Sequence, residues 1–219
     1  MSDFPSRLAH LDSCAISDAL DKLGLTGSVS GIHRYTTERR ISGRVVTVRL
    51  EQDDGRPAAS RHLGTTAIEI AQPGDVIVIE QRTGIDAASW GGNLSLGAQL
   101  RGVAGVIIEG PGRDMDEARQ YDFPVFARAH TARTARGRLV ETGTNVAVTV
   151  GDVVVAPGDF VVADGSAVVF VAAAEIERVL DAAEAIAARE RAMVAALREG
   201  RPITEVMGKS YETLLKPGR

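Results

Sequence analysis

The residues best suited to chemistry begin in a glycine-rich stretch, Trp90-Gly91-Gly92-Asn93-Leu94. Glycines let the backbone approach a ligand closely, and the free N–H groups at a helix N-terminus attract anions. Because a predicted helix over residues 94–100 follows, the amides of Asn93 and Leu94 could bind a carboxylate or a phosphate. The alternative is a flexible turn in which Asn93 is only an N-cap, and two adjacent glycines alone favour that simpler interpretation.

A second stretch with chemical potential, Gly110-Pro111-Gly112-Arg113-Asp114, directly follows the apolar run 103–108. Ligands of open α/β sheets bind beyond the carboxyl ends of parallel strands, and both stretches leave their strands at that edge, so they could face one another. Arg113 offers a planar fork for a carboxylate or an enolate oxygen, and Asp114 offers a hard oxygen ligand suited to Mg²⁺. The alternative is an ordinary loop that carries a solvated ion pair.

The third candidate, Glu190, is a carboxylate in an apolar stripe. It lies in a helix predicted over 174–200, where residues spaced by three and four are otherwise apolar. A carboxylate in an apolar seam is costly without a partner, so Glu190 could reach a site in a neighbouring subunit. The alternative, which the flanking Arg189 and Arg191 slightly favour, is that the helix has left the core there and Glu190 is solvated.

Helical and strand patterns place these residues in an α/β domain. Strand 76–79, helix 94–100 and strand 103–108 form a βαβ unit, which predicts that the two strands are parallel. Strands 76–79 and 160–163 each follow a Pro-Gly-Asp turn. The remaining predicted elements are a helix over 6–24, a strand over 41–51, a helix over 61–71, β-hairpins over 137–171 with a turn at Gly151-Asp152, and the long C-terminal helix over 174–200.

Composition limits the class of protein. The chain has 219 residues, of which 44% are hydrophobic, and a net charge of −4 with dispersed basic residues. This length fits a single domain over residues 1–219, and the charge gives no nucleic-acid footprint. The apolar runs are too short to span a bilayer, the N-terminus does not resemble a signal peptide, and the single cysteine suits a reducing compartment. We therefore expect a cytoplasmic protein that binds neither nucleic acid nor a membrane.

The candidate stretches, taken together, resemble a known family. Trp90-Gly91-Gly92-Asn93-Leu94, the run 101–108 and Arg113-Asp114 resemble the 4-hydroxy-4-methyl-2-oxoglutarate (HMG/CHA) aldolases, which share a superfamily with RraA, the regulator of ribonuclease E. The resemblance runs from about residue 10 to residue 200. Supporting matches outside this core are Ser17-Asp18-Ala19-Leu20, Ser42-Gly43, Gln72-Pro73-Gly74-Asp75, Asp122-Phe123-Pro124-Val125 and Pro157-Gly158-Asp159.

The resemblance implies an architecture and an assembly. The implied fold is α/β, a layered β/β/α sandwich of the swivelling-domain type with a long C-terminal helix. The implied assembly is a homotrimer or a homohexamer, a dimer of trimers, with sites between subunits. In such an assembly the helix over about 174–200 packs on a neighbouring subunit. Glu190 then contributes to that neighbour's metal site through a water molecule.

The resemblance also implies a reaction. The family members are class II lyases that use Mg²⁺ or Mn²⁺ to cleave a 4-hydroxy-2-oxo acid to pyruvate through an enolate, and oxaloacetate decarboxylation passes through the same enolate. Carried over by position, Arg113 would be catalytic and would also bind the substrate, and Asp114 would be the metal ligand. Gly91, Gly92, Asn93 and Leu94 would hold the substrate carboxylate.

The sequence departs from the aldolase pattern at Gly92, where the aldolases have an acidic residue. Glycine at this position, with Arg113-Asp114 and Glu117 following, resembles the ribonuclease-regulator side of the superfamily. The loss of a carboxylate should weaken metal binding, and Asn93 or Asp86 are candidates to compensate. The alternative function is therefore a non-catalytic binding protein that resembles the ribonuclease E regulator. A weaker alternative is a lyase or isomerase for another small 2-oxo or hydroxy acid.

Overall fold

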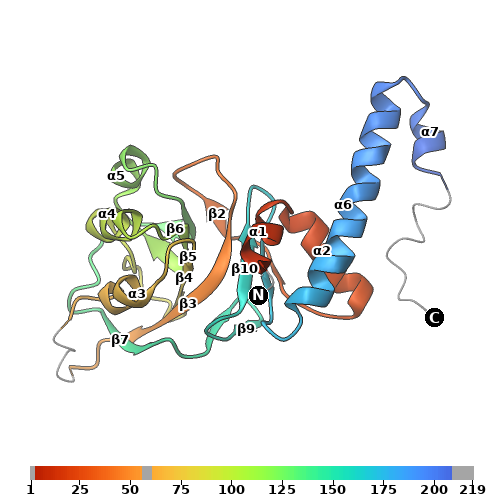
Figure 1. Cartoon of the computed structure of the whole chain (residues 1–219). Helices are drawn as coiled ribbons and strands as arrows, with labels where there is room; N and C mark the ends of the chain where they lie inside the picture. The colour runs from red at the N-terminus through yellow and green to blue at the C-terminus, as the bar shows by residue number, and fades with distance from the viewer. Residues whose placement is uncertain (1–2, 56–60, 209–219) are drawn as a thin grey trace.

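The computed structural model describes residues 3–55 and 61–208, and in these residues one curled nine-stranded sheet forms the centre of the molecule (Figure 1). Its strand order is β1-β11-β10-β3-β4-β5-β6-β2, and β7 pairs with the far part of β3, while β8 and β9 form a separate hairpin. The strands are β1 (Ser28–Val29), β2 (His33–Arg34), β3 (Ile41–Gln52), β4 (Val76–Gln81), β5 (Gly105–Gly112), β6 (Val125–His130), β7 (Leu139–Thr144), β8 (Val148–Val150), β9 (Val153–Val155), β10 (Phe160–Ala163) and β11 (Val168–Val171).

Helices cover this sheet in two groups that lie at opposite ends of the molecule (Figure 1). One group, α3 to α5, lies over the parallel strands, and the other, α1, α2 and α6, lies beside β10 and β11. The helices are α1 (Phe4–Ala9), α2 (Ser13–Leu23), α3 (Thr65–Ile70), α4 (Gly92–Leu100), α5 (Met115–Gln120), α6 (Ile176–Arg198) and α7 (Ile203–Val206). Among the described residues, no helix has the length and apolar character needed to cross a membrane.

The parallel half of the sheet has both faces covered. Strands β3, β4, β5 and β6 are mutually parallel, and almost every residue of β4 and most of β5 are buried. One face packs on α3 to α5, and the other packs on the β8–β9 hairpin and on the curled strands β10 and β11. Strands buried on both faces read as continuous apolar runs, which is why 76–79 and 103–108 carry no alternation. The predicted βαβ unit and the layered β/β/α class are confirmed.

The two Pro-Gly-Asp turns have the same local structure. In each, the aspartate accepts a hydrogen bond from the backbone N–H three residues earlier: Asp75 from Gln72 at 2.9 Å, and Asp159 from Ala156 at 2.8 Å. The glycine of each turn has a φ of 88°, a conformation that side chains disfavour. The predicted turns are therefore confirmed, and both aspartates are buried because these bonds satisfy their carboxylates.

The prediction of one helix over 6–24 is wrong, because the chain turns between α1 and α2. Asp12 adopts an extended conformation and caps α2 by accepting the N–H of Ala15 at 2.8 Å. Asp164, in the turn between β10 and β11, accepts the N–H of Ser13 at 2.8 Å and its hydroxyl at 2.7 Å. Partial burial alone would raise the pKa of Asp164, but the bonds from Ser13, Ser166 and Ala167 outweigh it and lower that pKa.

Helix α6 confirms the predicted C-terminal helix, and only its first half packs on the body. Ile176, Val179, Leu180, Ala183 and Ile186 are buried against α1, α2 and the strands β10 and β11. Beyond Ile186 no residue of α6 is buried, and α6 extends away from the sheet toward α7 (Figure 1). That this second half packs on a neighbouring subunit remains a prediction.

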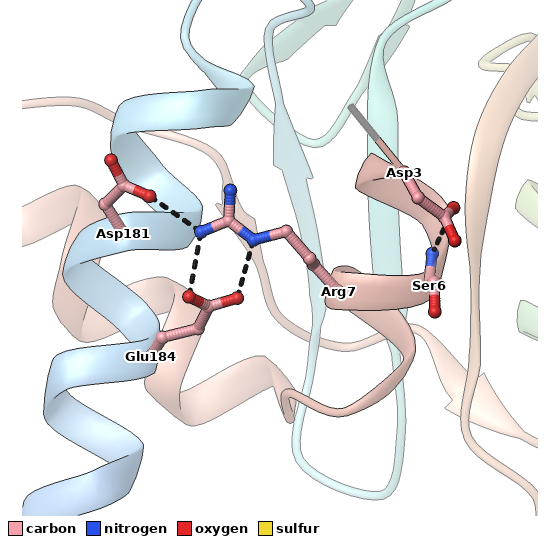
Figure 2. Close-up of polar contacts among 5 residues, drawn as sticks. All are labelled: Asp3, Ser6, Arg7, Asp181 and Glu184. Atoms are coloured by element: carbon pink, nitrogen blue, oxygen red, sulfur yellow. Dashed lines mark hydrogen bonds and ion pairs between the residues drawn. The ribbon is translucent and has the colours of Figure 1, made fainter. Parts of the chain in front are cut away.

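An arginine from α1 fixes the direction of α6. Figure 2 shows the guanidinium of Arg7 between two acidic residues of α6. Its Nε lies 2.7 Å from Glu184, and its Nη2 lies 2.7 Å from Asp181 and 2.8 Å from the second oxygen of Glu184. The bonds from Arg7 lower the pKa of the Glu184 carboxyl. This forked contact ties the long helix to the N-terminal segment as well as to the apolar core.

Candidate functional site

The two loops singled out in the sequence meet at one edge of the parallel sheet. The segment before α4 follows β4, and the Arg113-Asp114 pair follows β5, so both leave the carboxyl ends of neighbouring parallel strands. The N–H of Arg113 donates to the carbonyl of Trp90 at 3.0 Å, and the N–H of Gly92 donates to Oδ2 of Asp114 at 3.0 Å. The predicted juxtaposition of the two loops is therefore observed, and one backbone bond and one bond to the Asp114 carboxylate hold it.

Glycines at positions 91 and 92 leave room for the side chains of the facing loop and of α5. A β-carbon at Gly91 would lie 2.7 Å from Oδ2 of Asp114 and 3.3 Å from Nε of Arg113. A β-carbon at Gly92 would collide with the carboxylate of Glu117. Gly91 has an extended backbone, so the constraint is space and not backbone conformation.

Glu117 is a site residue that the sequence reasoning did not place. It stands in the first turn of α5, three residues after Asp114, so both carboxylates lie on the same side of that helix. Both line the same cavity, and in the described part of the chain the Glu117 carboxylate makes no hydrogen bond or ion pair. The spacing Arg-Asp-x-x-Glu was the available signal, and its importance appears only when Gly92 is seen to leave room for Glu117.

The first turn of α4 presents unpaired amides to the cavity. The intrahelical bonds begin with Ser95, whose N–H donates to the carbonyl of Gly91 at 3.0 Å. In the described residues, the N–H groups of Asn93 and Leu94 have no acceptor. These are the two amides that the sequence predicted for a carboxylate. Their arrangement is that of an anion site at a helix N-terminus.

Trp90 forms the support beneath this turn. Its side chain is only 2% exposed and stacks on Phe123 with ring centroids 6.2 Å apart. Its indole Nε1 donates to the hydroxyl of Ser95 at 3.0 Å, and that hydroxyl donates to the carbonyl of Gly91 at 3.1 Å. The indole therefore fixes the start of α4 through one hydroxyl group.

Asp114 has a left-handed backbone conformation, and its carboxylate contacts both Gly92 and Arg113. Its φ is 59°, one of three positive values among the described non-glycine residues. Such strain persists where the surrounding structure enforces it, often at functional sites. Its Oδ2 lies 3.2 Å from Nε of Arg113 and also accepts the N–H of Gly92, while Arg113 and Asp114 remain 38% and 32% exposed. Both side chains are therefore held in place yet accessible to a small molecule.

These residues line a cavity of about 500 Å³. Its inner end is formed by Trp90, Gly91, Gly92, Asn93 and Leu94, opposite Arg113, Asp114 and Glu117. The rest of its lining comes from Asp53 and residues 61–63 after β3, from residues 134–137 between β6 and β7, and from Leu139 and Val140 of β7. An arginine, two carboxylates and two free amides around one small cavity can bind a carboxylate at one side and stabilise a developing negative charge at the other.

A family model described as Aldolase/RraA matches residues 13–170, which is more than half of the chain. The chain belongs to the RraA-like family. Among curated relatives of this RraA-like protein, a putative 4-hydroxy-4-methyl-2-oxoglutarate aldolase of Halalkalibacterium halodurans is 31% identical over 155 residues, 69% of this chain and 68% of the relative. Protein DlpA of Legionella pneumophila is 25% identical over 153 residues, 70% of this chain but only 25% of the longer relative.

Two solved structures share the RraA-like fold. An uncharacterized protein from Pseudomonas syringae pv. tomato superposes with a TM-score of 0.83 at 26% identity, over 94% of this chain and 96% of the other. RraAS2 of Streptomyces coelicolor, described as an unusual member of the RNase ES inhibitor RraA family, superposes with a TM-score of 0.76 at 24% identity, over 87% and 95% of the two chains. The second likeness concerns the fold alone.

The residues at this RraA-like site fit a hard divalent cation. In the part of the chain that the structure describes, no group of three or more histidine, cysteine or acidic side chains could hold a metal. Asp114 and Glu117 nevertheless provide two carboxylates on one cavity, and Mg²⁺ is commonly held by one or two carboxylates with water or substrate completing its octahedron. Asp86, considered from the sequence as a compensating carboxylate, pairs instead with Arg133 at 3.3 Å.

Glu190 does not join the other site residues within one chain. It lies half-buried on α6, at the end of the molecule opposite α4 and α5 (Figure 1). Burial raises the pKa of Glu190, and the charges of Asp12 and Asp18 raise it further. Among the described residues no cation pairs with it. The apolar stripe in the sequence therefore identified a carboxylate whose charged form is disfavoured by burial and by nearby negative charges. Its assignment to a neighbouring subunit's site remains a prediction.

We predict opposite outcomes for two alanine substitutions in α4. Gly92→Ala should displace Glu117, lower the free energy of unfolding by about 1–3 kcal/mol and weaken Mn²⁺ binding by roughly tenfold or more. Gly97→Ala is the matched control, because a β-carbon there comes no closer than 4.0 Å to Ile68. It should stabilise the helix by about 0.5–1 kcal/mol and leave Mn²⁺ binding unchanged.

Urea unfolding and calorimetric Mn²⁺ titration measure both effects. Equal Mn²⁺ affinity in the two variants would contradict the role given to the Gly92–Glu117 contact.

Proposed function

We propose that this protein is a metal-dependent class II pyruvate aldolase-like lyase, which cleaves a 4-hydroxy-2-oxo acid such as 4-hydroxy-4-methyl-2-oxoglutarate to pyruvate and also decarboxylates oxaloacetate. The observation that carries the proposal is the position of Glu117. Its carboxylate occupies the space beside Gly92, so the cavity has a second carboxylate although residue 92 is not acidic. Membership of the RraA-like family and the names of the relatives support the same reaction class.

Substrate binding uses the inner end of the cavity. The free amides of Asn93 and Leu94 bind the C1 carboxylate of the substrate, aided by the N-terminal dipole of α4. This places the neighbouring C2 carbonyl toward Arg113, whose guanidinium donates to the keto oxygen. Asp114 is the proposed ligand of Mg²⁺ or Mn²⁺. When bound there, the cation supplies Lewis-acid stabilisation of negative charge at the keto oxygen.

Cleavage then needs one proton acceptor and one anion stabiliser. Glu117 removes the proton of the 4-hydroxyl group, the C3–C4 bond breaks, and its electron pair forms the C2–C3 double bond of pyruvate enolate while C4 becomes a carbonyl. Arg113 stabilises the enolate oxygen with charge-assisted hydrogen bonds. Protonation of C3 completes pyruvate. With oxaloacetate the same C3–C4 bond breaks, carbon dioxide leaves, and the same enolate results.

Glu190 completes the proposed site from a second subunit. Its own α6 carries it away from the cavity of its chain, and the part of α6 that follows it is not buried (Figure 1). In the proposed trimer or hexamer, Glu190 of one subunit would help to hold the metal of the next subunit through a water molecule. The raised pKa of Glu190 in the isolated chain is the cost that a neighbouring cation would relieve.

The alternative function is a non-catalytic binding protein that resembles the ribonuclease E regulator. It was suggested by the missing carboxylate at Gly92. Glu117 supplies a second carboxylate beside Gly92, which the lyase can use, while the same combination of Gly92 and Glu117 is the one that resembles the regulator. A purified protein that captures a ribonuclease and forms no pyruvate would support the alternative.

Oxaloacetate decarboxylation by purified protein tests the proposed reaction. We expect pyruvate release above the metal-only blank with Mg²⁺ or Mn²⁺, and its loss on chelation. Arg113→Ala should lower kcat by about 100-fold or more, the usual effect of removing an oxyanion stabiliser. Arg119→Ala is the matched control, because Arg119 pairs with Asp116 on α5 and does not line the cavity. Undiminished turnover in Arg113→Ala would sink this assignment.

Mixed oligomers test the contribution of Glu190. Asp114→Ala and Glu190→Ala homo-oligomers should each be inactive. Co-expression with two affinity tags should give hybrids with about one third of wild-type activity in a trimer and about one quarter in a hexamer, because a head-to-tail interface pairs some intact cavities with an intact Glu190. Hybrids that contain both chains and show no recovered activity would place Glu190 outside the site.

A further inference from the structure

The cavity is lined by a histidine that has no role in the reaction as described so far. His62 lies in the segment between β3 and α3, and it lines the same cavity as Arg113, Asp114 and Glu117. We propose that His62 is the acid that delivers a proton to C3 of the enolate, the step that forms pyruvate. This inference rests on the proposed function, which generates that enolate.

The proton balance of oxaloacetate decarboxylation requires a proton donor other than the substrate. When the C3–C4 bond breaks, carbon dioxide leaves without a proton, and the bonding electron pair becomes the C2–C3 double bond of the enolate. The new C3–H bond of pyruvate then needs a proton. In aldol cleavage Glu117 has just received one from the 4-hydroxyl group, but oxaloacetate has no such hydroxyl. The donor must therefore be recharged from water in each cycle.

His62 is suited to this step by its residue type. Histidine changes charge near neutral pH, so it can both give a proton and be recharged by water. Arginines keep their protons, and the carboxylates Asp114 and Glu117 are assigned to the metal and to the substrate hydroxyl. Among the described lining residues there is no second histidine and no lysine, tyrosine or cysteine. The ionisable lining residues around His62 are Asp53, Arg61, Arg113, Asp114, Glu117 and Arg136.

One hydrogen bond determines which ring nitrogen of His62 exchanges a proton. Nδ1 lies 3.0 Å from the carbonyl oxygen of Leu63. Because a carbonyl oxygen only accepts, Nδ1 carries the hydrogen in this bond, which leaves Nε2 to gain and lose a proton. Within the described part of the chain the imidazole has no other hydrogen bond or ion pair, and His62 is exposed. Nε2 is therefore available to a substrate and accessible to water.

The backbone around His62 is fixed to the elements that hold the substrate. The carbonyl of His62 accepts the hydroxyl of Thr65 at 2.7 Å and its N–H at 3.2 Å. The N–H of Gly64 donates to Oε2 of Glu141 at 2.8 Å, and a β-carbon at Gly64 would lie 3.3 Å from the ring of Trp90. Since Trp90 supports the first turn of α4, His62 is held relative to the amides that bind the substrate carboxylate.

His62→Ala should separate two reactions that share the enolate. Exchange of the pyruvate methyl protons with D₂O requires proton transfer at C3 in both directions, and His62→Ala should slow it by about 100-fold or more, the usual contribution of a positioned acid or base. Release of carbon dioxide from oxaloacetate should fall much less, because the enolate can leave the site and be protonated by water. Added imidazole should restore methyl exchange in proportion to its concentration.

His130→Ala is the matched control, because His130 is an exposed histidine at the end of β6, next to the loop of Arg113, and does not line the cavity. It should leave both rates at the wild-type value, and imidazole should not change them.

Calorimetric titration of the Mn²⁺-loaded protein with oxalate, a dianion shaped like the enolate, tests the same contact without turnover. Titrations in two buffers of different ionisation enthalpy give the number of protons taken up on binding. Near neutral pH, wild type should take up more protons than His62→Ala, because the bound anion favours the protonated imidazole. His130→Ala should match wild type.

Each failure has its own signature. Unchanged exchange in His62→Ala, or equal slowing of exchange and carbon dioxide release without rescue by imidazole, would overturn the role of His62 while the wild-type protein still made pyruvate. Equal proton uptake by wild type and His62→Ala would overturn it as well. A metal-loaded wild type that shows neither reaction would overturn the lyase itself, and the protonation step with it.

Discussion

The contact between the start of α4 and the loop after β5 is the constraint on which the site depends. Two hydrogen bonds hold these segments together: the backbone N–H of Arg113 donates to the carbonyl of Trp90, and the backbone N–H of Gly92 donates to the side-chain carboxylate of Asp114. Side chains at positions 91 and 92 would displace the side chains of Asp114 and Glu117 from their present positions. Because the glycines keep them close, the unpaired amides of α4, the guanidinium of Arg113 and the two carboxylates surround one small volume, as electrostatic preorganisation requires.

The same constraint gives the glycine at position 92 a chemical meaning. In the sequence, Gly92 stands where the aldolases have an acidic residue. In the structure, the carboxylate of Glu117 lies where a side chain at position 92 would begin. Glu117 of α5 can take the place of a carboxylate at position 92 of α4 because glycine at that position has no side chain. The proposed lyase therefore needs Glu117 and Gly92 as a pair. In the proposed assembly, Glu190 of α6, the helix at the end of the molecule opposite α4 and α5 (Figure 1), would link catalysis to assembly.

The sequence predicted the parallel βαβ unit, both Pro-Gly-Asp turns and the long C-terminal helix, because each has a strong local signal, while the layered class was predicted from the family resemblance. It missed the break between α1 and α2, since that break depends on Asp164, which is distant in sequence and binds Ser13. It paired the two site loops correctly from the rule that parallel strands end at one edge. It could not place Glu117, because a collision with a β-carbon at residue 92 is a property of three-dimensional packing.

The central claim is that this cavity forms and stabilises the enolate of pyruvate. The most direct measurement is proton NMR of pyruvate in D₂O with the purified protein, because methyl exchange requires the enolate and no knowledge of the acceptor. The account predicts loss of the methyl signal that depends on Mg²⁺ or Mn²⁺ and disappears in Arg113→Ala. Exchange no faster than the metal-only blank, in protein shown to bind the metal, would contradict it.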